Sequence, residues 1–266
     1  MSNASQLNIG SGSGQNHFKL QIGVTGAGAQ TEQTQAQIVA GYSNNPQFLE
    51  VPSRNAVQFS VRADGPVSGS TYPRCELREM NTDGTTVMAF NASTGVHWCR
   101  ARIRIGTLGP VRPHCTFFQM HDAGTVDEVV SLSSQVNSTT GDNELRLRLW
   151  DSATGLPKLI VGCGTGDTYD FMFSINNGAW AFYWQDLSVP IYDSNDYAAD
   201  GFVNTFSNVA EMYFKLGCYP QTNVTYDAPT TYISSEVSYL SHWHTGWPTP
   251  NAITLPKTAQ FSPFFG

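Results

Sequence analysis

Alternating apolar and polar residues, with a period of two, recur along most of this chain. Such alternation is typical of strands that bury one face. Seven stretches alternate or are rich in β-branched and aromatic residues: "AVQFSVRA" (56–63), "HWCRARIRIG" (97–106), "CTFFQMH" (115–121), "NELRLRLWD" (143–151), "FMFSINNGAWAFYW" (171–184), "EMYFKLGCY" (211–219) and "SSEVSYLSHWH" (234–244). Asn177-Gly178 predicts a two-residue hairpin turn inside the fifth stretch. Because no segment sustains a helical period, the pattern predicts an all-β protein.

These strands are expected to form one domain over residues 17–266, since no linker rich in Pro and Gly divides them. Many short antiparallel strands in one domain must stack or close to hide their edges. The pattern therefore predicts a β-sandwich of the jelly-roll type. Residues 1–16 are rich in Ser, Gly and Asn and are expected to be a disordered tail.

Composition narrows the functional classes. Of the 266 residues, 40% are hydrophobic and only 13% are charged, which suits a large β core and argues against a coiled coil. The net charge of −7 disfavours a nucleic-acid partner, because phosphate binding requires a basic surface. No run is long enough to span a membrane, and no basic or apolar leader predicts a signal peptide. A small basic cleft for an anionic ligand remains compatible with the total charge.

A metal or other cofactor is not expected. The five cysteines include no CxxC pair and have no histidine at ligand spacing nearby, and their odd number leaves at least one free thiol. His242 and His244 in "HWH" share one face of a strand and form a possible metal pair. With no third ligand in view, a terminal strand of the sandwich is the better interpretation.

Charged residues with a period of two mark the stretch "YPRCELREM" (72–80). Arg74, Glu76 and Arg78 fall on one face of a strand, while Cys75 and Leu77 fall on the other. A stripe of both charge signs beside an apolar face predicts a surface that binds a ligand.

Two further stretches have the same division into a polar and an apolar face. In "CTFFQMH", Gln119 and His121 share one face, and Phe118 and Met120 share the other. The polar face of "YFKLGCYPQ" has Tyr213, Lys215, Gly217, Tyr219 and Gln221. An ordinary solvated sheet would instead have mainly Ser, Thr, Lys and Glu, so the three strands together predict one binding face.

In this order, "YPRCELREM", "QMH" and "YFKLGCYPQ" resemble the three signature motifs of family 7 polysaccharide lyases, the alginate lyase family. The likeness runs from "HFKLQIG" (17–23) to "SSEVSYLSHWH". It implies a concanavalin-like jelly roll whose concave sheet binds a uronate polymer and cleaves it by β-elimination without a metal. Cys75 stands where the family usually has Ser or Thr, and Met120 where it usually has Ile or Val. Both fall on apolar faces, so the cleft chemistry is expected to be retained.

The chemistry of β-elimination requires three kinds of group. A base removes the C5 proton of a uronic acid, an acid protonates the leaving 4-O-glycosidic oxygen, and cationic or amide donors neutralise the C5 carboxylate. Arg74, Gln119, His121 and Tyr219 are of the required types and are the predicted catalytic residues. The resemblance implies the same assignment, with His121 or Tyr219 as base according to the uronate epimer and with Tyr219 as acid.

Five more residues are predicted to bind substrate: Glu76, Arg78, Tyr213, Lys215 and Gln221. The two cations would hold neighbouring carboxylates, Glu76 would orient an arginine or accept a sugar hydroxyl, and Gln221 would contact hydroxyls. A structural ion pair or a surface polar group explains each of these residues equally well. Arg100, Arg102 and Arg104 on another strand either extend a polyanion track or belong to the opposite, convex face.

The sequence therefore predicts a lyase that cleaves a uronate polymer, most simply alginate, and that acts as a monomer. The family resemblance implies an extracellular protein, but the sequence itself leaves the compartment open. The alternatives are a lyase for another polyuronate such as glucuronan, a glycoside hydrolase, and a non-catalytic carbohydrate-binding jelly roll. A hydrolase needs two acids facing each other across the cleft, and the motifs offer only Glu76. A binding module needs neither His121 nor Tyr219. Preference among mannuronate, guluronate and glucuronate stays open, as does endo or exo action.

Overall fold

The structure is a computed structural model that describes residues 3–10, 15–23, 29–123, 128–149, 157–200, 206 and 211–247. The elements in chain order are α1 (Asn3–Gln6), β1 (Phe18–Ile22), β2 (Thr31–Gln33), α2 (Gln35–Val39), β3 (Phe48–Val51), η1 (Pro52–Arg54), β4 (Ala56–Arg62), β5 (Cys75–Glu79), β6 (Val96–Ile105), β7 (His114–Asp122), β8 (Val130–Val136), β9 (Asn143–Leu149), β10 (Pro157–Gly162), β11 (Thr168–Asn176), β12 (Ala179–Trp184), β13 (Tyr192–Asp193), α3 (Ser194–Ala199), β14 (Met212–Pro220) and β15 (Tyr232–His244).

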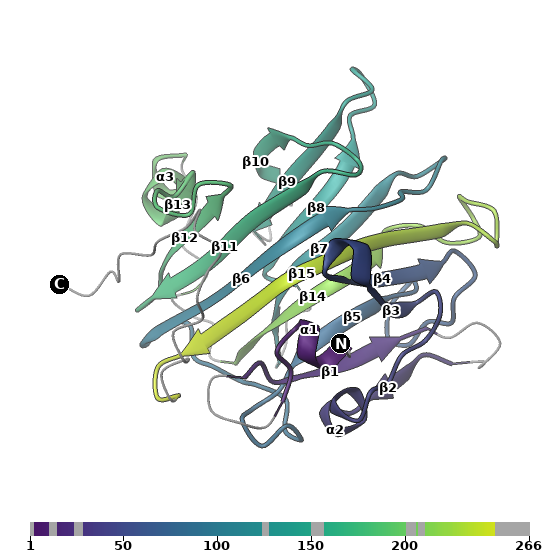
Figure 1. Cartoon of the computed structure of the whole chain (residues 1–266). Coiled ribbons are helices and arrows are strands. Elements are labelled where there is room, and N and C mark those ends of the chain that lie inside the picture. The colour runs from purple at the N-terminus through teal and green to yellow at the C-terminus, as the bar shows by residue number, and fades with distance from the viewer. Residues whose placement is uncertain are drawn as a thin grey trace.

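The strands form two antiparallel sheets that pack face to face (Figure 1). The eight-stranded sheet has the order β10-β9-β8-β7-β14-β5-β1-β2, and the seven-stranded sheet has the order β13-β12-β11-β6-β15-β4-β3. Strands far apart in the chain are neighbours in both, because β14 lies between β7 and β5 and β15 lies between β6 and β4. The predicted all-β sandwich is confirmed. The hairpin turn is confirmed too, since Asn177 (φ 49°) and Gly178 (φ 85°) join β11 to β12.

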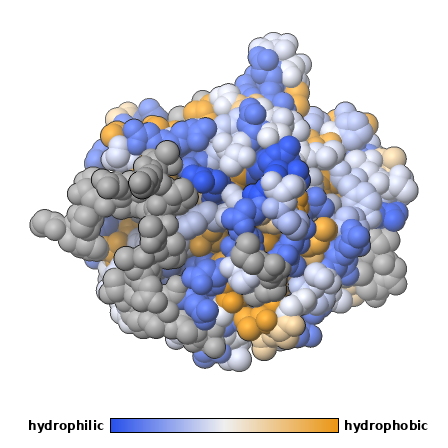
Figure 2. Space-filling model, in the orientation of Figure 1, coloured by the Kyte–Doolittle hydropathy of each residue, from blue (hydrophilic) through white to orange (hydrophobic). Residues whose placement is uncertain are grey.

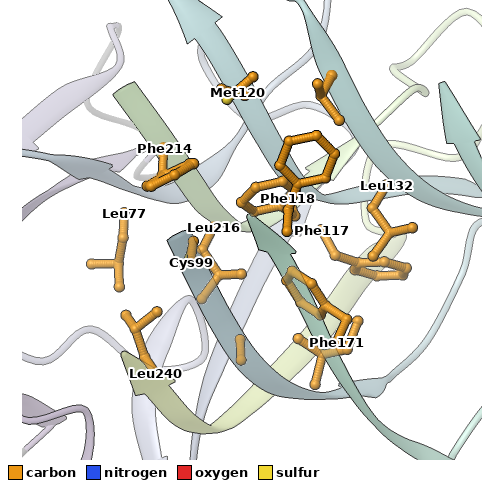
Figure 3. Packing of buried hydrophobic residues seen from close by; sticks show 14 of the residues in the cluster. Leu77, Cys99, Phe117, Phe118, Met120, Leu132, Phe171, Phe214, Leu216 and Leu240 are labelled. Atoms are coloured by element: carbon orange, nitrogen blue, oxygen red, sulfur yellow. The ribbon is translucent and has the colours of Figure 1, made fainter. Parts of the chain in front are cut away.

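The core lies between the sheets, where the apolar faces of the strands meet. Figure 3 shows Phe118 of the eight-stranded sheet and Phe171 of the seven-stranded sheet, whose ring centroids are 5.2 Å apart. Phe117 and Phe118 are both fully buried, although consecutive strand residues normally face opposite ways. The pairing of β7 with β8 shifts register between Thr116 and Phe118, and this bulge turns both rings inward.

The N-terminal segment differs from its expected disorder. Residues 3–6 form helix α1, and Leu7 and Ile9 are buried in the core. The side-chain amide of Asn16 donates to the carbonyls of Leu7 and Leu240, both at 2.7 Å, and so ties the segment to β15. The prediction of disorder was based on the many Ser, Gly and Asn residues of the segment, and it overlooked the apolar residues Leu7 and Ile9.

Part of the predicted domain cannot be compared with the structure. Residues 248–266 lie outside the described residues, as do Trp150 and Asp151 at the end of a predicted strand. Within the described part of the chain, no helix has the length and apolar character needed to cross a membrane.

Candidate active site

The three motifs lie on adjacent strands of the eight-stranded sheet. β14 is the central strand of the three and pairs with β5 on one side and β7 on the other. Lys215 of β14 is opposite Arg78 on one neighbour and Gln119 on the other. Because paired residues share a face, these polar side chains all lie on the face that points away from the core.

Gly217 allows β14 and β5 to approach closely in the middle of this face. Its φ is +150°, and a Cβ atom there would lie 2.5 Å from the carbonyl oxygen of Cys75. On the other side of β14, the pairing with β7 shifts register between Leu216 and Tyr219, an interval that includes Gly217. Glycine is therefore required where the chain turns toward the position of Tyr219.

Arg74 and Tyr219 are in direct contact. The guanidinium of Arg74 lies 4.5 Å from the centroid of the Tyr219 ring, and its Nη1 is 3.7 Å from Glu76 Oε2. Burial raises the pKa of the Tyr219 hydroxyl, and the charge of Arg74 opposes this only in part. Tyr219 is thus protonated at neutral pH, which suits an acid more than a base.

A buried ion pair lies next to this contact. Lys215 Nζ is 2.6 Å from Glu76 Oε2 and donates to Gln119 Oε1 at 3.3 Å, and the side chains of Lys215 and Glu76 are 1% and 0% exposed. Burial lowers the pKa of Lys215 to about 8, although Glu76 favours its charged form. The enclosure of this pair favours a positioning role for both residues over direct contact with sugar.

Gln119 is held at both ends of its amide. Its Oε1 accepts from Lys215, and its Nε2 donates to a carboxylate oxygen of Glu128, a residue that the sequence analysis missed. Burial raises the pKa of Glu128. An amide nitrogen has two hydrogens, so one is not used in this bond. Glu128 lies outside the motifs, and no spacing rule connects it to Gln119.

His121 lies two residues beyond Gln119 on the same face of β7. Its ring stacks on Tyr213 with centroids 5.5 Å apart, and Arg78 lies 4.5 Å from the centre of the same tyrosine ring. Burial lowers the pKa of His121 to about 2, with Lys215 and two arginines adding to the effect. His121 is therefore neutral and has a lone pair available to accept a proton.

Further cations extend the face toward β9. In the pairing across the sheet, Gln119 is opposite Ser131 of β8, and Ser131 is opposite Arg148 of β9. Arg146 lies two residues away on the same strand and donates to Glu144 at 2.8 Å. The alternation in "LRLRL" was the signal that would have identified these two arginines.

Aromatic residues enclose the end of the face near Tyr219. The Tyr72 ring lies 6.5 Å from that of Tyr219 by centroids, and its hydroxyl accepts from Arg112 at 2.7 Å. Gln221 directly follows β14, and its backbone nitrogen donates to the carbonyl of His114 at 2.9 Å. Gln221 therefore lies at the rim rather than beside the Lys215–Glu76 pair.

Arg100, Arg102 and Arg104 belong to the other layer. They lie on β6 of the seven-stranded sheet and line a cavity of about 660 Å³. Arg102 pairs with Asp170 at 2.7 Å, and Arg104 pairs with Glu236 at 3.2 Å. Figure 2 shows hydrophilic residues gathered on this face, which Figure 1 turns toward the reader. These arginines do not extend the face that has the motifs.

Comparisons with known proteins agree on one family. The family model described as alginate lyase matches residues 14–244. An alginate lyase from Corynebacterium sp. has 23% identity and a TM-score of 0.73, covering 92% of this chain and 98% of that one. An alginate lyase from Pseudomonas aeruginosa has 18% identity and a TM-score of 0.69, covering 86% and 98%. No curated protein matches this chain.

Proposed function

Because this chain belongs to the alginate lyase family, we propose that it cleaves alginate by β-elimination on the outer face of its eight-stranded sheet. The observation that carries the proposal is a continuous set of contacts from Arg74 through Tyr219 and Lys215 to Gln119. His121 lies next to Gln119 on the same face. This arrangement contains a cation, an amide donor, a neutral base and a protonated acid.

The cation and the amide prepare the substrate for loss of its C5 proton. Arg74 presents a planar fork that suits a carboxylate, and its buried Nε has no partner within the described residues. The free hydrogen of Gln119 Nε2 adds a second donor. Together they would neutralise the uronate carboxylate and stabilise the negative charge that develops when C5 is deprotonated.

The acid and the base then act on two bonds. His121 Nδ1 or Nε2 accepts the C5 proton, the C5–H electrons form the C4–C5 double bond, and the C4–O4 bond breaks. Tyr219 donates its proton to the leaving oxygen, and Arg74 stabilises the phenolate that remains. His121 takes up one proton and Tyr219 releases one. No water molecule takes part in the bond cleavage.

A hydrolase is less well supported by the same face. Glu76 and Glu128 are two acids near the cleft, but Glu76 is fully buried and bound to Lys215. It therefore has no path to a glycosidic oxygen or to a water molecule on a sugar. Mass spectrometry of short products separates the reactions, because a lyase product is lighter than a hydrolysis product by one water molecule. Saturated products alone would contradict the proposal.

The extended row of cations suits a polymer with one carboxylate per sugar. Arg78 on β5 and Arg148 on β9 lie on opposite sides of the Lys215–Gln119 row. We propose that the chain of sugars crosses the strands along this row, and that the protein acts outside the cell as a monomer. Comparing polymannuronate, polyguluronate and glucuronan as substrates determines which epimer the site prefers.

Replacing Arg74 with Lys is expected to lower kcat/KM by about a hundredfold. Lysine keeps the charge but loses the planar fork that can donate two parallel hydrogen bonds, as well as the guanidinium stacked on Tyr219. Cys75→Ser is the matched control, since its fully buried Sγ donates to the Gln47 carbonyl at 3.2 Å and a hydroxyl can do the same. If Arg74→Lys kept near wild-type activity and folded Cys75→Ser lost its activity, Cys75 and not Arg74 would face the substrate, and the assignment of the two faces would be wrong.

The rate at alkaline pH is expected to depend on Lys215. Burial lowers its pKa to about 8, so the ammonium that holds Gln119 is present below that pH and is lost as the pH rises through it. We expect kcat/KM, which reports the free enzyme, to fall about tenfold per pH unit above this value. The pKa of Tyr219 is raised and does not cause the fall. A profile that stays flat to about pH 10 would contradict the role given to Lys215.

A further inference from the structure

Glu79, His242 and His244 meet inside the protein, away from the motif face. Glu79 ends β5 of the eight-stranded sheet, and the two histidines end β15 of the seven-stranded sheet. Glu79 Oε1 lies 2.6 Å from His244 Nε2 and 3.2 Å from His242 Nε2. All three residues are buried, and one potential ligand atom from each lies within 4.8 Å of the others. The histidine pair of "HWH" thus has the third ligand that its sequence neighbourhood lacks.

Hydrogen bonds fix the tautomer of His244. His97 Nε2 lies 3.1 Å from the Asn91 carbonyl and 2.8 Å from the Thr94 carbonyl, so it must be the protonated nitrogen of His97. His97 Nδ1 is then an acceptor, and His244 Nδ1, 2.9 Å away, donates to it. Neutral His244 consequently has its lone pair on Nε2, which faces Glu79.

The same reasoning applies to His242. Asn16 Nδ2 donates to two backbone carbonyls, which leaves Asn16 Oδ1 as an acceptor 2.9 Å from His242 Nδ1. His242 therefore donates from Nδ1 and has its lone pair on Nε2, and this buried atom has no hydrogen-bond partner in the described structure. Glu79 Oε2 is already engaged, since it accepts from the Phe214 backbone nitrogen at 2.8 Å.

Three lone pairs thus converge in a buried space, and such a convergence requires a positive centre. One proton on Glu79 would satisfy one histidine and leave the other lone pair unpaired. A metal ion would bind all three atoms at once.

We propose that Glu79, His242 and His244 bind a divalent transition-metal ion of the Zn²⁺ class, which joins the two sheets. Zinc lies about 2.0–2.2 Å from nitrogen and oxygen ligands, which places tetrahedral ligand atoms about 3.3 Å apart. The Glu79–His242 separation of 3.2 Å already fits, and the Glu79–His244 separation of 2.6 Å must widen by less than about 1 Å. The ligand nitrogens of the two histidines, which lie within 4.8 Å of each other, must take up the same spacing.

The surroundings match those of protein metal ligands. Metal-binding histidines usually donate their other ring nitrogen to a fixed acceptor, as these two do to Asn16 and His97. The Trp247 ring system lies roughly perpendicular to both imidazoles, with centroids 5.1 and 4.8 Å away. Such enclosure suits a structural ion, and the site would hold the end of β5, the strand that includes Arg78.

The test measures metal directly and does not depend on catalysis. The full chain, with an affinity tag that lacks histidine, is produced in medium supplemented with Zn²⁺ or with Co²⁺, because a buried site fills as the protein folds. We expect about one metal ion per chain by elemental mass spectrometry and intense visible absorption from tetrahedral cobalt. Glu79→Gln and His244→Gln are expected to lose at least nine-tenths of the bound metal, while the control His114→Gln keeps it.

Two results would overturn the proposal. Wild-type protein with less than a tenth of an equivalent of metal, and with no visible cobalt absorption, would mean that a proton occupies the cluster. Metal retained in full by folded Glu79→Gln and His244→Gln would mean that it binds elsewhere. If these variants do not fold, the decision falls to the metal content and cobalt spectrum of the wild-type chain, whose expected values are unchanged.

Discussion

Replacing Tyr219 with Phe is expected to lower kcat by a factor of about 10² to 10⁴, the usual contribution of a positioned acid. The substitution removes the hydroxyl that protonates the leaving oxygen but keeps the ring beside Arg74. KM and the melting temperature should change little. Initial rates at saturating substrate, measured with thermal melting of the same preparation, test this directly.

Tyr232→Phe is the matched control for that variant. Tyr232 lies on β15 of the other sheet, where its ring is 6.0 Å from the Arg62 guanidinium, so loss of its hydroxyl should leave turnover unchanged. A Tyr219→Phe protein that turns over at the wild-type rate would require a different acid.

Replacing His121 with Ala is expected to abolish most turnover, by a factor of about 10² to 10⁴. The neutral imidazole is the proposed base. His114, the other histidine of β7 on this face, lies at the opposite end of the strand, near Arg112, Arg146 and Arg148. Loss of its stacking on Tyr213 should lower the free energy of unfolding by only about 0.5–1.5 kcal/mol. Circular dichroism and melting therefore separate lost chemistry from lost folding.

The acid limb of the pH profile adds a second check on His121. Its pKa is lowered to about 2 in the free protein, so it stays unprotonated as the pH falls through 6.5, the ordinary value for histidine. We therefore expect kcat/KM to show no fall with a midpoint near 6.5. Retention of near-full activity by His121→Ala at saturating substrate would exclude it as the base.

Much of the fold was predictable because strand alternation depends only on local sequence. The apolar faces of the motif strands, such as Leu77 and Phe214, are buried as the period of two requires. The sheet to which a strand belongs is not a local property. Arg100 and Arg146 have similar alternating contexts, "RARIR" and "LRLRL", yet they lie on different sheets. Only the long-range pairing of β6 with β15 and of β9 with β8 separates them.

The candidate site was predictable to the extent that its residues lie in the three motifs. Alternation with a period of two predicted that Arg74, Gln119 and Tyr219 lie on the polar faces of their strands. The sheet order places these three strands side by side, so that the polar faces form one surface. Glu79 was missed because its histidine partners are distant in sequence, and Glu128 because it lies outside the three motifs although it is only nine residues from Gln119. The full burial of Glu76 could not be predicted from its local sequence either, because its partner Lys215 lies on another strand.

The central claim, that the motif face catalyses β-elimination, is tested most directly by counting bonds during the cleavage of alginate. Each β-elimination creates one reducing end and one C4–C5 double bond, and the double bond absorbs in the ultraviolet. We predict that absorbance and reducing ends rise together in a ratio of one to one with the wild-type protein, and that both rise at least about a hundredfold more slowly with Tyr219→Phe. Reducing ends that increase without the absorbance, or a wild-type protein that binds alginate and produces neither signal, would contradict the account.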